Sequence, residues 1–100
     1  MILNKEHILE FLRKNREYLK QNFEVTSISL FGSFARGEET EESDVDLLVE
    51  IEKPTPHNVV GLQIYLEEQF SRTVHVVRKH FRLKERFVRI IKDLNNLGYQ

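Results

Sequence analysis

The sequence contains no cysteine, which excludes a disulfide framework, a zinc-thiolate site and a thiol nucleophile. It also lacks a long apolar run at its start. Charges interrupt segment 1–16 at Lys5, Glu6, Glu10, Arg13 and Lys14. Signal peptides and membrane spans both need an uninterrupted apolar stretch, so the sequence predicts neither. We therefore expect a cytoplasmic protein that has no membrane partner.

Neither sign of charge is in excess. The 15 lysine and arginine residues are balanced by 16 aspartate and glutamate residues, which leaves a formal net charge of -1. Strong binding to the phosphate backbone of DNA or RNA depends on clustered positive charge. The composition therefore disfavours direct binding to nucleic acid.

Internal repeats and linkers rich in glycine, serine or proline are absent as well. The 100 residues, 40% of them hydrophobic and 31% charged, are typical of one globular domain, and we expect residues 1–100 to form it. A separate substrate-recognition domain does not fit into this length. A large substrate is therefore expected to bring its own docking surface.

Periodic apolar residues predict three long helices. The first follows Asn4 as its N-cap, and its single buried stripe contains Ile8, Leu12, Leu19 and Phe23. The second is capped by Thr55, begins at Pro56 and buries Val59, Leu62, Leu66 and Phe70. The third carries Leu83, Phe87, Ile90, Ile91 and Leu94 and ends near Asn95, Asn96 and Gly98.

Alternating apolar residues predict three core strands, at 27–31, 45–51 and 73–78. The order helix, strand, strand, helix, strand, helix indicates an α/β (α+β) fold, in which helices pack on a small mixed sheet. The strand at 45–51 has Val45, Leu47, Val49 and Ile51 on one face, so Asp44 and Asp46 lie together on the other.

These two aspartates are a candidate magnesium site. Two carboxylates on one strand face supply hard oxygen ligands, and triphosphate oxygens with water would complete the shell. Taken alone, such a pair is more often two solvated acids. The preceding turn changes this interpretation: Gly32 and Ser33 end a strand, and residues 34–36 begin a short helix whose free N–H groups would face a phosphate. Arg36 adds positive charge beside it.

Two segments, GSFARG at 32–37 and SDVDLLV at 43–49, resemble the motifs of the minimal nucleotidyltransferase family of the DNA polymerase beta superfamily. The resemblance covers nearly the whole chain. It implies a polymerase beta-like nucleotidyltransferase fold and transfer of a nucleoside monophosphate, usually AMP from ATP, to an acceptor hydroxyl. It further implies that Gly32 and Ser33 hold the β and γ phosphates, with Arg36 supporting them. Asp44 and Asp46 would hold Mg²⁺ against the α phosphate.

The sequence departs from this family at one position. Active members carry a third carboxylate on the third core strand, where this chain has His75 in the segment TVHVV. His75 could act as the general base or bind a softer ion such as Mn²⁺. Alternatively, the lost charge leaves a domain that binds nucleotide but transfers it slowly or not at all. A structural histidine is the third reading.

Single-domain members of this family resemble the antitoxin of a toxin-antitoxin module whose toxin is a small helical HEPN ribonuclease. The resemblance implies an antitoxin that adenylylates a tyrosine of its HEPN partner and also binds it. The alternative is a catalytically weakened nucleotide-binding antitoxin or regulatory subunit that acts by complex formation. For transfer to a small molecule such as an aminoglycoside, the sequence has no substrate-pocket signature. Association of identical chains stays open.

Overall fold

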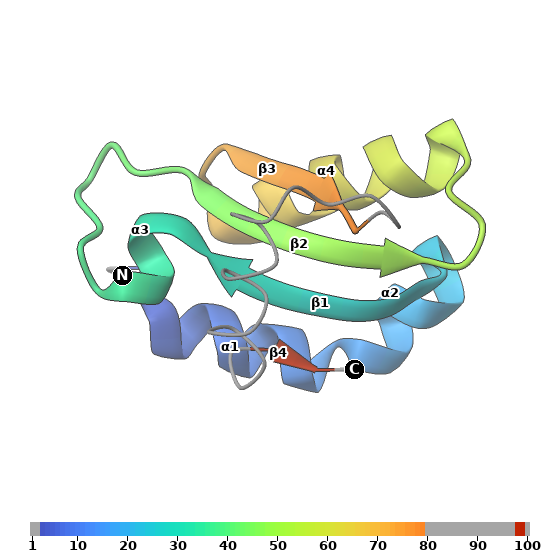
Figure 1. Cartoon of the computed structure of the whole chain (residues 1–100), viewed down its shortest axis with the longest axis horizontal. Helices are drawn as coiled ribbons and strands as arrows, with labels where there is room; N and C mark the ends of the chain where they lie inside the picture. The colour runs from blue at the N-terminus through green and yellow to red at the C-terminus, as the bar shows by residue number, and fades with distance from the viewer. Residues whose placement is uncertain (1–2, 80–97, 100) are drawn as a thin grey trace.

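A four-stranded sheet in the order β3-β2-β1-β4 forms the centre of the computed structural model, which describes residues 3–79 and 98–99 (Figure 1). Along the chain the elements are α1 (Lys5–Lys14), α2 (Arg16–Phe23), β1 (Val25–Phe31), α3 (Gly32–Arg36), β2 (Val45–Ile51), α4 (Pro56–Phe70), β3 (Val74–Arg78) and β4 (Gly98–Tyr99). β1 pairs antiparallel with β2 and β4, whereas β2 pairs parallel with β3. The predicted mixed sheet and its three core strands are confirmed.

The fourth strand was not predicted. Gly98 was expected to end the last helix, but Gly98 and Tyr99 pair with Ser29 and Ile28 of β1. A two-residue strand has too little alternation to be recognised in a sequence, and only its partner strand defines it. The helix predicted over residues 83–94 lies outside the described residues.

One face of the sheet forms the hydrophobic core. The alternating residues Val45, Leu47 and Val49 of β2 are almost fully buried, as are Ile28 and Leu30 of β1. They pack together with apolar residues of α1, α2 and α4 in a single cluster. α2 and α4 lie behind the sheet in Figure 1, and α1 lies below it. Because strand residues alternate, Asp46 lies on the other face of β2, which it shares with the buried Leu48.

The predicted N-terminal helix is two helices. Asn4 caps α1 as predicted, since its Oδ1 accepts the backbone N–H of His7 at 2.9 Å. The chain then breaks at Asn15, whose side-chain amide donates to the carbonyl of Phe11 at 2.8 Å. Asparagine competes for backbone hydrogen bonds in this way and so favours helix ends. The apolar spacing continues across the break, and for this reason the prediction missed it.

α4 begins as predicted, because Thr55 Oγ1 accepts the backbone N–H of Asn58 at 3.2 Å and Pro56 is the first helical residue. The prediction that Val59 is buried was wrong, since Val59 is half-buried and the neighbouring Asn58 is buried instead. The Asn58 amide donates to the Glu24 carboxylate at 2.9 Å and to the carbonyl of Lys53 at 2.8 Å. A polar side chain is stable inside the protein once its hydrogen bonds are made.

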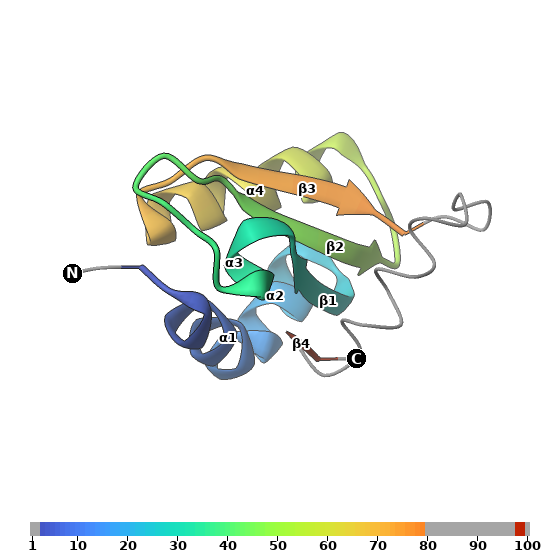
Figure 2. The ribbon, with the colours of Figure 1, turned by 60° about the vertical axis from the view of Figure 1, so that its left-hand side comes forward.

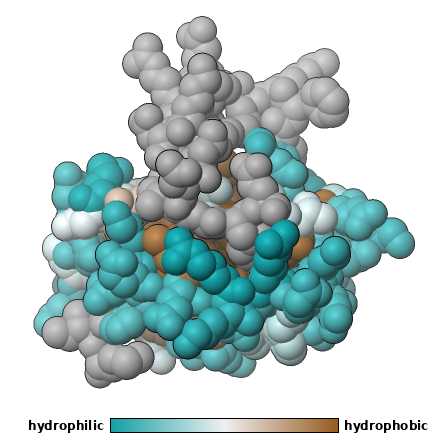
Figure 3. Space-filling view, turned by 90° about the horizontal axis from the view of Figure 1, so that it is seen from below, coloured by the Kyte–Doolittle hydropathy of each residue, from teal (hydrophilic) through white to brown (hydrophobic). Residues whose placement is uncertain are grey.

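Aromatic rings join the helices behind the sheet. Tyr65 of α4 stacks on Tyr18 of α2 with ring centroids 4.9 Å apart, and Phe23 lies 5.7 Å from Tyr65. α4 approaches closely at Gly61, where an added Cβ would lie 3.0 Å from the Phe23 ring. Seen from below, hydrophilic residues cover most of the coloured part of this face, and some hydrophobic residues show near its middle (Figure 3). Within the described residues, none of the helices has the length and hydropathy needed to cross a membrane.

Candidate active site

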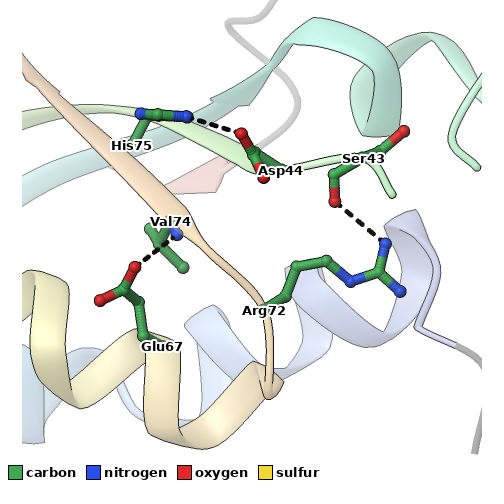
Figure 4. Close-up of polar contacts among 6 residues, drawn as sticks. All are labelled: Ser43, Asp44, Glu67, Arg72, Val74 and His75. Atoms are coloured by element: carbon green, nitrogen blue, oxygen red, sulfur yellow. Dashed lines mark hydrogen bonds and ion pairs between the residues drawn. The ribbon is translucent and has the colours of Figure 1, made fainter. Parts of the chain in front are cut away.

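The sheet face opposite the core carries the predicted carboxylates together with His75. In the parallel pairing of β2 and β3, Asp46 lies opposite His75. Nε2 of His75 lies 2.8 Å from Oδ2 of Asp44, and this pair is drawn in Figure 4. Their side chains are 54% and 43% exposed, so the pair faces solvent. The prediction that His75 shares a face with the aspartates is confirmed.

Gly32 lies directly against Asp46. The end of β1 pairs with β2 at Phe31 and Asp46, which brings the first residue of α3 beside the carboxylate. A Cβ added at Gly32 would overlap Oδ2 of Asp46 and lie 3.1 Å from its Cγ. Gly32 also has φ +76°, a left-handed conformation that side chains disfavour. Two independent reasons therefore require glycine at this position.

Asp46 is harder to ionise than an ordinary aspartate. Burial raises the pKa of its carboxyl above the usual 3.8, and repulsion from Asp44 adds to the rise, while the charges of His75 and Arg36 oppose it. The folded chain thus holds two carboxylates whose negative charges repel each other. A bound cation would relieve this repulsion.

The other residues predicted for the site lie on α3. Arg36 is at its last turn, and its Nε forms an exposed ion pair with Glu38 at 3.1 Å. The positive charge of Arg36 opposes the rise in the pKa of Asp46, although Arg36 forms its ion pair with Glu38. Ser33 follows Gly32, and its carbonyl accepts the backbone N–H of Glu38 at 2.9 Å. These bonds hold the motif at 32–37 in one compact turn beside β2.

The predicted magnesium can be tested against the side chains present. Among residues 3–79 and 98–99 there is no group of three or more histidine, aspartate or glutamate side chains that could hold a metal by itself. Asp44 and Asp46 are nonetheless two hard oxygen donors that repel each other. Mg²⁺ commonly binds through one or two carboxylates together with substrate phosphates. The donor set therefore fits a magnesium ion that arrives with a triphosphate.

A pocket of about 510 Å³ next to the loop of residues 37–44 was not anticipated. Its lining comes from the N-terminal segment, this loop and the turn after α4: Leu3, Glu39, Thr40, Glu41, Phe70, Ser71 and Arg72. Figure 2 shows the loop running beside the turn between α4 and β3. No sequence motif joins these three segments, because only the fold brings them together.

Comparison with known proteins agrees with this geometry. Residues 12–97 match the family described as nucleotidyltransferase domain, which is most of the chain. The chain belongs to the nucleotidyltransferase domain family. The matched residues include the glycine turn at 32–37 and the carboxylate pair Asp44 and Asp46.

Two relatives of this nucleotidyltransferase domain are named for one activity. A protein of Methanocaldococcus jannaschii assigned as a protein adenylyltransferase is 44% identical over 75 residues, which cover 72% of this chain and 75% of the relative. The protein adenylyltransferase MntA of Thermococcus cleftensis is 38% identical over 79 residues, which cover 78% of this chain and 80% of the relative.

Solved structures share the fold of this nucleotidyltransferase domain. A chain from a crystal structure of a toxin-antitoxin with AMP-PNP superposes with a TM-score of 0.61 at 22% identity, covering 92% of this chain and 69% of that chain. A chain from a crystal structure of a toxin-antitoxin MntA-HpeT mutant gives a TM-score of 0.59 at 20% identity, covering 89% of this chain and 67% of that chain. At these identities the similarity establishes the fold alone.

Proposed function

We propose that this chain is a protein adenylyltransferase that acts as an antitoxin, transferring AMP from ATP to a tyrosine hydroxyl of a HEPN-type toxin. The observation that carries this proposal is the contact between Gly32 and Asp46, which joins the glycine turn to the carboxylate pair. The relatives from Methanocaldococcus jannaschii and Thermococcus cleftensis support the same activity.

In the proposed reaction the tyrosine oxygen attacks the α phosphorus of ATP, and the bond from that phosphorus to the bridging oxygen of pyrophosphate breaks. Gly32 and Ser33 hold the β and γ phosphates through backbone N–H groups and the Ser33 hydroxyl, and Arg36 offsets part of the phosphate charge. Asp44 and Asp46 hold Mg²⁺, which when bound stabilises charge on the attacking and leaving oxygens. Mn²⁺ suits the same oxygen ligands.

His75 is proposed as the group that takes the hydroxyl proton. Asp44, once ionised, can only accept a hydrogen bond, so the 2.8 Å contact requires a proton on Nε2 of His75. A neutral imidazole has a single ring proton. Nδ1 then carries the lone pair and can act as a general base. Asp44 would thus orient the imidazole as well as bind the metal.

A second candidate function follows from a different observation. The site has two carboxylates, and His75 stands where active members of the family carry a third. Among the described residues, no group of three or more histidine, aspartate or glutamate side chains could hold a metal by itself. A nucleotide-binding antitoxin or regulatory subunit that acts by complex formation needs no efficient transfer. In that case the chain would bind ATP and its partner protein without modifying the partner.

The test combines binding with transfer. ATP is titrated calorimetrically into the protein with Mg²⁺ and then with Mn²⁺, and a purified HEPN-type partner is incubated with ATP labelled on either the α or the γ phosphate. AMP transfer labels the partner from α-labelled ATP alone. The matched control is the Asp44→Asn/Asp46→Asn protein, which keeps the shape of both side chains but removes their charge.

Metal-dependent binding and α-label transfer that the double variant loses would support the adenylyltransferase. Binding of ATP and partner without transfer would favour the second candidate. Absence of ATP binding with either metal would overturn both.

A further inference from the structure

Arg72, in the segment between α4 and β3, reaches across to the loop of residues 37–44. Its Nη1 donates to the carbonyls of Thr40 and Ser43, each at 3.0 Å. The guanidinium also lies over the ring of Phe34, with Cζ 5.4 Å from the ring centroid, which is within the range of a cation-π contact. One side chain thus contacts both α3 and the loop that leads to the carboxylates.

The loop has a local shape of its own. The backbone N–H of Thr40 donates to Oγ of Ser43 at 2.8 Å, and the N–H of Ser43 donates to the carbonyl of Thr40 at 3.1 Å. These bonds close a turn within residues 40–43. They do not fix the position of this turn relative to the sheet. The two hydrogen bonds from Arg72 connect the turn to the segment that leads into β3.

Asp44 follows this turn directly. On one side, the carbonyl of Ser43 is held by Arg72, and on the other, the N–H of Val45 donates to the carbonyl of Thr73 at 2.9 Å. Arg72 and Thr73 are neighbours at the base of β3, so a single short segment fixes the backbone on both sides of Asp44. Figure 4 shows Arg72 extending toward Ser43, with the Asp44–His75 pair above it.

We propose that Arg72 is a positioning residue for Asp44, and hence for nucleotidyl transfer, although it does not touch the reacting atoms. This inference rests on the proposed function for its effect on catalysis. Both hydrogens of one planar nitrogen are used for the two carbonyls, while the flat guanidinium covers Phe34. A lysine keeps the charge and can donate to the carbonyls, but it lacks the flat surface.

The test uses the 100-residue chain with Arg72→Met, which keeps the aliphatic stem, and Arg72→Lys, which keeps the charge. Arg13→Met, at an exposed arginine of α1, is the matched control. Hydrogen exchange of the amides in residues 40–45 is measured without nucleotide, and kcat and KM for ATP are measured with the HEPN-type partner. Thermal melts establish that each variant is folded.

We expect the loop amides of Arg72→Met to exchange about tenfold faster, while amides in the centre of β1 and β2 keep their protection. We expect kcat to fall about tenfold with KM for ATP changed little, because Gly32 and Ser33 still bind the phosphates while Asp44 is misplaced. Arg72→Lys should recover part of both effects, and Arg13→Met should match the wild type.

Unchanged loop exchange in a folded Arg72→Met protein would overturn the proposal, and so would an unchanged kcat in a chain whose wild type is active. A higher KM for ATP with an unchanged kcat would also contradict the proposal. A wild-type chain without any transfer would overturn the proposed function instead, and the exchange of residues 40–45 would still decide whether Arg72 holds the loop.

Discussion

A Cβ added at Gly32 would overlap Oδ2 of Asp46, so no side chain fits at position 32 unless this carboxylate moves. Gly32→Ala is therefore expected to displace the carboxylate as well as strain a backbone with φ +76°. Gly37→Ala is the matched control, because Gly37 has φ +71° but nothing within 4 Å of an added Cβ. Gly37→Ala should lower the free energy of unfolding by about 1–2 kcal/mol.

Gly32→Ala should cost about 1–3 kcal/mol more than the control, since overlap is added to backbone strain. Urea denaturation measures both changes, and calorimetry measures metal-dependent ATP binding, which only Gly32→Ala should lose. Equal losses of stability in the two variants would show that the Asp46 carboxylate moves away from an added Cβ at little cost in free energy.

Asp46→Asn is expected to stabilise the protein at neutral pH while abolishing its function. The pKa of Asp46 is raised in the folded state, so ionisation lowers stability as the pH rises from the usual value of 3.8 through the folded pKa. An uncharged asparagine removes this loss. The Tm of Asp46→Asn should therefore exceed that of the wild type at pH 7, and the difference should shrink as the pH falls through the pKa of Asp46.

The same substitution removes one of the two proposed metal ligands, and we expect transfer to fall by about a hundredfold or more. A lower Tm at pH 7 would contradict the inferred strain at Asp46, whereas undiminished transfer would contradict its assignment as a ligand.

His75→Asp places a third carboxylate opposite Asp46 in the β2–β3 register. Without metal, the added repulsion should lower the Tm by about 4–8 °C, which corresponds to about 1 kcal/mol in a domain of this size. Mg²⁺ should restore more of this loss than it does in His75→Asn, because three carboxylates bind the ion better than two. Melts in EDTA and in Mg²⁺ provide the measurement, and an equal response of the two variants would argue against a metal at this position.

Asn58 is expected to be a strong determinant of stability outside the site. Asn58→Ala leaves the carbonyl of Lys53 and the Glu24 carboxylate without this partly buried donor, which should cost about 1–3 kcal/mol in the free energy of unfolding. Asn22→Ala is the control, because its exposed amide donates to the carbonyl of Tyr18 within the same helix, and a change within about 0.5 kcal/mol is expected. Similar losses in the two variants would show that the buried bonds contribute little.

The regular parts of this protein could be predicted because their signals are local. In the strand at 45–51, Val45, Leu47 and Val49 alternate on the core face, and the caps at Asn4 and Thr55 use side chains that bond within three residues. The break at Asn15 was missed because the apolar spacing of two consecutive helices continues across it. Burial of Asn58 was missed because its partner Glu24 lies 34 residues away.

By itself, the sequence determined the two motifs, their order and the shared face of Asp44 and Asp46, since these follow from strand periodicity and glycine chemistry. Only the tertiary structure decided how the pieces meet. The pairing of β3 with β2 brings His75 to Asp44, the turn after β1 presses Gly32 against Asp46, and Arg72 reaches the loop from a segment 29 residues from Ser43. Such contacts depend on sheet order and register, which the packing of the whole core selects and no single segment encodes.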